Sequence, residues 1–100
     1  MIKQIKIGYK TYKVIEDARM ADAEGNIGSI NYHDCEINVC PRLGKEMRCD
    51  TLVHEAVHGM LMFMGENDKN NDDNAVERIA QGVLMLIRDN PKLFMEFTKG

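Results

Sequence analysis

Apolar residues alternate with polar ones at Ile5, Ile7 and Tyr9 and again at Tyr12 and Val14, with a period of two that is typical of strands. The alternation over residues 5–14 is interrupted near residues 8–11, which predicts a hairpin that turns there. Two further strands are predicted at residues 27–32 and 36–39, with a turn at His33 and Asp34 between them.

The period changes to that of a helix at about residue 45 and remains helical to residue 64, where Gly65 follows in the usual C-terminal position. The apolar band of this helix consists of Leu52, Val53, Ala56, Val57, Met60, Leu61 and Met64. A second helix is predicted at 73–88, and a short terminal helix after Pro91. The residues of the second helix that we expect to face inward are Val76, Ile79, Ala80, Val83, Leu84 and Ile87.

Two polar segments connect these elements: residues 16–26, expected to form a loop or a short helix, and the loop at 66–74. No repeat, linker or low-complexity tract divides the chain. We therefore predict one domain over residues 1–100, of the α+β class, with a small N-terminal sheet followed by helices.

Composition excludes several classes of protein. The chain has 13 basic and 16 acidic residues, well mixed, so no basic patch indicates nucleic-acid binding. No apolar run is long enough to span a bilayer, and the N-terminus lacks the apolar stretch of a signal peptide. The odd count of 3 cysteines indicates reduced thiols. We expect a cytoplasmic protein, in the host cytoplasm if it is phage-encoded.

The central helix carries the strongest chemical signal, the sequence TLVHEAVHGML at residues 51–61. His54 and His58 are four residues apart, so both imidazoles lie on one helix face and can bind one metal ion. Glu55, between them, can act on a water molecule at that ion without being a ligand. This H-E-x-x-H arrangement predicts two zinc ligands and a general base.

The third protein ligand has two candidates. His33 lies in the predicted turn, and Glu77 lies on the second helix, where antiparallel packing would bring it back to the histidines. Glu77 also has a structural explanation: if Asn74 caps the second helix, Glu77 closes a capping box. We prefer the metal, because a carboxylate among apolar neighbours needs a partner.

Other metal sites fit the sequence less well. A calcium loop starting at Asp68 fails, because Asp73 and Ile79 stand where that loop needs glycine and glutamate. A structural zinc site would have to use a set of residues whose spacing matches no compact zinc motif: His33, Cys35, Cys40 and Cys49.

The segments TLVHEAVHGML and NAVERIAQGVLMLIRDNP, preceded by EINVCP, resemble the ImmA/IrrE family of small zinc metallo-endopeptidases, common in bacteriophages and mobile elements. The resemblance extends from about Gly25 to the end. It implies a minimal zincin-like fold in which His54, His58 and Glu77 bind Zn²⁺ and Glu55 is the catalytic base. Some members of the family cleave helix-turn-helix repressors, so a phage or host transcriptional regulator is the substrate that the resemblance implies.

The resulting hypothesis is zinc-dependent hydrolysis of a peptide bond in a protein substrate. Tyr32 or His33 is a candidate to stabilise the oxyanion. The substrate is expected to pair, as an added strand, with the segment Cys35, Glu36, Ile37, Asn38 and Val39. Two alternatives are a non-catalytic, zinc-stabilised interaction domain and a metal-free module that binds a helix through its methionines. The sequence does not give the oligomeric state.

Overall fold

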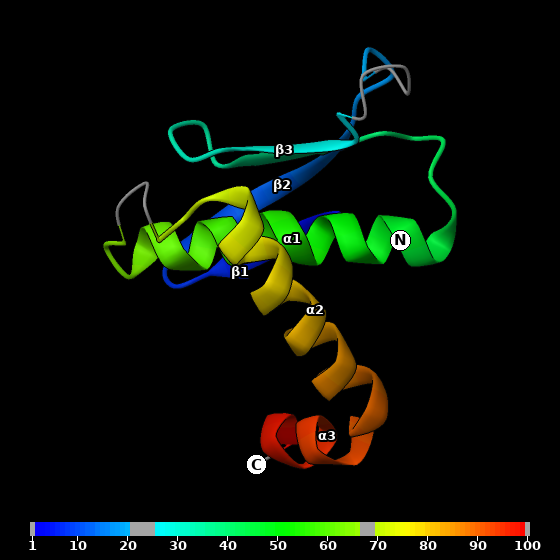
Figure 1. Ribbon diagram of the computed structural model, residues 1–100, viewed down its shortest axis with the longest axis vertical. Coiled ribbons are helices and arrows are strands. Elements are labelled where there is room, and N and C mark those ends of the chain that lie inside the picture. Colours follow the sequence, from blue (N-terminus) through cyan, green and yellow to red (C-terminus); the bar gives the residue numbers. More distant parts are fainter. Residues whose placement is uncertain (1, 21–25, 67–69, 100) are drawn as a thin grey trace.

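The computed structural model describes residues 2–20, 26–66 and 70–99 of the chain. Residues 21–25 of the loop or short helix expected at 16–26, and Asp68 of the calcium loop, lie outside the described residues. The elements are β1 (Gln4–Ile7), β2 (Lys10–Glu16), β3 (Gly28–Asn31), β4 (Glu36–Val39), α1 (Lys45–Phe63), α2 (Asp73–Asp89) and α3 (Pro91–Lys99). A four-stranded sheet followed by three helices confirms the α+β prediction (Figure 1).

The strands lie in the order β1-β2-β4-β3. β1 and β2 form the predicted antiparallel hairpin, closed by the pair Ile7 and Lys10 across a two-residue turn. Gly8 in that turn has φ +63°, a conformation that glycine adopts without steric cost. β4 pairs in parallel with β2 and antiparallel with β3, so β4 lies inside the sheet and β3 lies at its edge.

Helix α1 covers one face of the sheet, with contacts to β1, β3 and β4 (Figure 1). The core between helix and sheet is formed by Ile7, Tyr12, Ile37, Val39 and Leu52. The other side of α1 packs against α2 through a second cluster, formed by Val57, Val76 and Ala80. α1 is therefore buried on two sides, which fixes the direction of the side chains between them.

Both ends of the α1–α2 connection are set by local hydrogen bonds. At the end of α1, Glu66 N–H donates to the Leu61 carbonyl and Gly65 N–H to that of Met62, a Schellman motif with Gly65 at φ +82°. α2 begins at the N-cap Asp72, whose side chain accepts a hydrogen bond from Ala75 N–H at 2.7 Å.

α2 extends beyond α1, and α3 folds at its far end (Figure 1). The prediction for the inward face of α2 is therefore correct only in part. Val76 and Ala80 are buried, and Val83 and Leu84 are half-buried. Ile79 is 40% exposed although it lies in the first half, and Ile87 is 44% exposed near the far end, where α2 has led away from α1 (Figure 1). No helix in the described part of the chain is long and apolar enough to cross a lipid bilayer.

Candidate metal centre

His54 and His58 project from the face of α1 that meets the start of α2. The two rings lie 5.0 Å apart between centroids. Nε2 of His58 is 2.9 Å from Oδ1 of Asp73, and Nε2 of His54 is 3.4 Å from the same oxygen. The first residue of α2 thus brings one carboxylate oxygen to both imidazoles.

The other nitrogen of each ring is held by an oxygen acceptor. Nδ1 of His54 is 2.9 Å from Oε2 of Glu77, and Gln81 donates at 3.0 Å to the second oxygen of that carboxylate. Nδ1 of His58 is 2.7 Å from Oδ1 of Asn71. With a proton on Nδ1, each ring would donate to this acceptor and leave the lone pair of Nε2 for a metal ion; without an ion, a proton on Nε2 lets the ring donate to Asp73.

Three possible ligand atoms thus converge: the two Nε2 atoms and Oδ1 of Asp73. Among the described residues, His54, His58 and Asp73 are the one group of three or more possible metal-ligating side chains whose ligand atoms lie within 4.8 Å of one another. Ligands of a tetrahedral zinc ion with bonds of about 2.0–2.1 Å are about 3.3 Å apart, close to the spacings observed here. The donor set therefore fits a divalent cation.

The Asp73 carboxyl is adapted to the charged form. The hydrogen bond with His58 is the main cause that lowers the pKa of Asp73; partial burial opposes it, and the hydrogen bond with His54 lowers the pKa further. An ionised carboxylate is the form that binds a metal ion.

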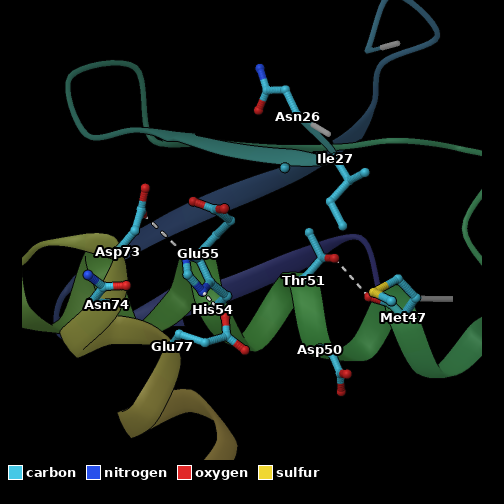
Figure 2. A pocket seen from close by; sticks show the side chains of 11 residues that line it. Asn26, Ile27, Met47, Asp50, Thr51, His54, Glu55, Asp73, Asn74 and Glu77 are labelled. Atoms are coloured by element: carbon cyan, nitrogen blue, oxygen red, sulfur yellow. Dashed lines mark hydrogen bonds and ion pairs between the residues drawn. The ribbon is translucent and has the colours of Figure 1, made fainter. Parts of the chain in front are cut away.

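Glu55 lies on the sheet side of α1, directed toward β3, whereas His54 lies between Asp73 and Glu77 (Figure 2). The Glu55 residue is only 7% exposed, and burial raises the pKa of its carboxyl above the ordinary value. The charge of Asp73 also raises it, whereas the charges of His54 and His58 lower it. A raised pKa brings a carboxyl closer to the range in which it can both accept and release a proton near neutral pH.

Gly28 allows this position of Glu55. A Cβ atom at Gly28 would collide with Cγ2 of Thr51 and lie 3.2 Å from Oε2 of Glu55. The missing side chain therefore lets the edge strand approach α1 at the height of the Glu55 carboxylate.

The site opens into a cavity of ≈ 560 Å³ (Figure 2). Its lining comes from the start of β3, from α1 and from the first turns of α2, and includes Gly28, His54, Glu55, Asp73 and Glu77. His54, Asp73 and the buried carboxyl of Glu55 therefore share one open cavity.

Several residues that the sequence suggested for substrate or oxyanion binding have other surroundings in the structure. The prediction that a substrate pairs with residues 35–39 is wrong, because β4 is already paired on both sides. The hydroxyl of Tyr32 accepts a hydrogen bond from Nδ2 of Asn71 at 3.3 Å. The same Asn71 side chain contacts Nδ1 of His58. His33 is exposed in the turn between β3 and β4 and does not line the cavity.

Two structural alternatives are also resolved. The capping box at Glu77 is wrong, because Asp72 rather than Asn74 caps α2, and Glu77 falls two residues beyond the N3 position. The group His33, Cys35, Cys40 and Cys49 does not gather: none of the four belongs to the cluster described above. Glu77 as a third metal ligand stays a prediction; its observed contact is with Nδ1 of His54.

Sequence reasoning missed two residues of the site. Asp73 precedes Glu77 by four positions, so both lie on one face of α2, and that spacing could have identified Asp73 as an equal candidate. Asn71 comes from a polar loop without periodicity, and no signal in the sequence distinguishes it from its neighbours.

Comparison of the chain with protein-family profiles, with curated proteins and with solved structures found no match.

Proposed function

We propose that this protein is a zinc-dependent endopeptidase of the ImmA/IrrE type, which hydrolyses a peptide bond in a protein substrate. One observation carries the proposal: Nε2 of His54, Nε2 of His58 and Oδ1 of Asp73 converge beside a buried glutamate that follows the first histidine directly. A purely structural site needs the three ligands but has no need of Glu55.

His54, His58 and Asp73 would hold the ion. Zinc bound there would lower the pKa of a water molecule and polarise the scissile carbonyl. Glu77 and Asn71 fix the ring orientations through the two Nδ1 atoms, as partners of metal-binding histidines generally do.

Glu55 would take up the proton of the attacking water and deliver it to the leaving amine. Its place in the cavity wall supports this role, and so does its raised pKa. Because Glu55 belongs to the wall shared with the start of β3, a substrate lying along β3 would meet it directly.

The free edge of β3 is the strand that a substrate would use. β3 pairs only with β4 in the described sheet, and the residues at its start line the cavity. An extended peptide added to this edge would gain backbone hydrogen bonds and cross the site.

Metal analysis tests the centre. Elemental analysis of wild type should give about one zinc per chain, lost in His54→Ala and in Asp73→Ala. Asp50→Ala is the matched control, because Asp50 lines the same cavity from α1 without belonging to the cluster. Glu77→Ala should lower zinc affinity by about 10–100-fold without removing the site. Zinc lost with Glu77→Ala but kept with Asp73→Ala would make Glu77 the ligand.

Cleavage tests the chemistry. Glu55→Gln should bind zinc as wild type does and lose cleavage of a protein substrate found by incubating the enzyme with candidate proteins. Full cleavage by the Gln variant would contradict the role of Glu55. A zinc-loaded wild type whose digests match those of Glu55→Gln would indicate a non-catalytic, zinc-stabilised interaction domain.

A further inference from the structure

Helix α2 from Ile79 onward and helix α3 carry large apolar side chains that are at least 40% exposed in the described structure. We call these residues the α2–α3 apolar surface: Ile79 (40% exposed), Leu86 (47%), Ile87 (44%), Leu93 (58%) and Phe97 (86%). The end of α2 and the whole of α3 lie at the end of the molecule away from the sheet (Figure 1).

The surface continues the stripe by which α2 packs on α1. Val76 and Ala80 are 0% and 1% exposed, and Ile87 follows on the same face of the helix. The stripe is therefore built for burial along its whole length, but α1 covers only its first part. The second part needs another partner.

Helix α3 needs one as well. It has 9 residues, and among the described elements it contacts only α2. Isolated helices shorter than about 12–15 residues are marginal in water, so tertiary packing has to supply their stability. α3 places Leu93 and Phe97 four residues apart on one face, which is the pattern of a helix that packs against a partner.

The size of the surface matches half of a dimer interface. Taking about 150–200 Å² for each fully exposed large side chain, the exposed fractions amount to roughly 400–550 Å² of apolar area. A standard interface buries about 800 Å² per partner, of which about 56–65% is apolar, that is, about 450–520 Å².

The charges around the surface suit a second copy. Residues 78–99 include the cations Arg78, Arg88, Lys92 and Lys99 and the anions Asp89 and Glu96. Because both signs are present in this segment, a copy related by a two-fold axis can place opposite charges together. A single-signed edge would repel its own copy.

We infer that the α2–α3 apolar surface binds a second copy of this chain in a two-fold dimer. The second half of α2 and α3 of each copy pack as four helices, and the two metal centres stay outside the interface, at the other ends of the α2 helices. The dimer does not depend on the metal, and it leaves the free edge of β3 accessible.

Sedimentation equilibrium of the full chain tests the inference, with and without a chelator. Wild type should be dimeric at about 100 µM, and dilution should dissociate it, because association follows mass action. Ile87→Lys and Phe97→Lys should each weaken the dimer at least about 100-fold, as hot-spot positions do. Met62→Lys is the matched control: Met62 is 43% exposed, almost the same as Ile87, but lies on α1 outside the surface.

Both surface variants should retain the circular dichroism and cooperative unfolding of a folded monomer, because their side chains are solvated in the single chain. A wild type that stays monomeric at about 100 µM overturns the inference. So does a dimer that Met62→Lys weakens as much as Ile87→Lys, or an open-ended series of larger species. Loss of zinc binding or of cleavage would contradict the proposed function and leave this result unchanged.

Discussion

The two halves of helix α2 follow one apolar pattern but meet different surroundings. In the first half, Val76 and Ala80 are sealed against α1, and the acidic residues of the same turns are held at the histidines. In the second half, residues of the same type, Leu86 and Ile87, are 47% and 44% exposed. The sequence of an amphipathic helix thus determines which face is apolar. The neighbouring element determines how much of that face is buried, and therefore where side chains are held in fixed positions for a site.

Introducing a charge into each half of α2 should give the largest difference in the free energy of unfolding between the two halves. Val76→Asp would bury an unpaired carboxylate between α1 and α2 and should lower the free energy of unfolding by about 3–5 kcal/mol. Ile87→Asp should change it by less than about 1 kcal/mol in the monomer, because the side chain stays in water. Urea denaturation with chelator, at a protein concentration low enough to keep the chain monomeric, measures both. Equal losses would mean that the two halves are equally packed.

Adding a methyl group at two glycines sharpens the same contrast. Gly28→Ala should cost about 1–3 kcal/mol, because its Cβ meets Thr51 and Glu55, and it should reduce cleavage by displacing the Glu55 carboxylate. Gly82→Ala, in the second half of α2, has no atom within 4 Å of its Cβ and should stabilise the helix by about 0.5–1 kcal/mol. Thermal unfolding distinguishes the opposite signs. A destabilised Gly82→Ala variant would show that α2 is already covered at this point.

The same contrast explains what the sequence could predict. Periodicity located every strand and helix, since alternation and the 3.6-residue repeat are local properties. His54, Glu55 and His58 were found because they share one helix, whose geometry fixes their spacing. The extent of the inward face of α2 was overestimated, because the direction in which α2 leads away from α1 is a tertiary property (Figure 1).

Strand order and the full ligand set depend on long-range packing. The alternation at residues 36–39 is the same for an edge strand and an interior strand, so the sequence could not show that β4 lies between β2 and β3. Which acidic residue of α2 meets Nε2 of the histidines depends on how α2 packs against α1 through Val76 and Ala80.

The pH dependence of stability should report the burial of Glu55. Because burial raises the pKa of Glu55 in the folded protein, the protonated form favours folding. Its contribution is fully present below the ordinary glutamate pKa of about 4.3 and is lost as pH rises through the raised value. Metal-free Glu55→Gln should therefore become increasingly stable relative to wild type as pH rises through this window. The pKa of Asp73 is lowered and acts in the opposite direction, but Asp73 is present in both proteins. A difference in stability that stays constant with pH would contradict a raised pKa of the buried Glu55 carboxyl.

The smallest expected effect concerns Asn71, which precedes α2 and holds the His58 ring. Asn71 accepts from Nδ1 of His58 and donates to the carbonyl of His58 and to the hydroxyl of Tyr32. Tyr32→Phe removes one hydrogen bond and should lower the free energy of unfolding by about 0.5–1.5 kcal/mol. It should lower zinc affinity by less than 10-fold, whereas Asn71→Ala, which frees the His58 ring itself, should lower it by about 10–100-fold.

Competition with a chromophoric chelator measures the zinc affinity of both variants. The rate of cleavage by Tyr32→Phe then distinguishes the two possible roles of Tyr32, support of Asn71 and stabilisation of the oxyanion. If Tyr32 only supports Asn71, cleavage at saturating zinc should stay close to that of wild type, because the ring of His58 is again held by the bound ion. Normal zinc affinity with a loss of cleavage of about 100-fold would instead assign the Tyr32 hydroxyl to the oxyanion, the role that the sequence suggests. The hydrogen bond between Asn71 and Tyr32 would then break during the reaction, because the hydroxyl would have to leave Asn71 to reach the substrate.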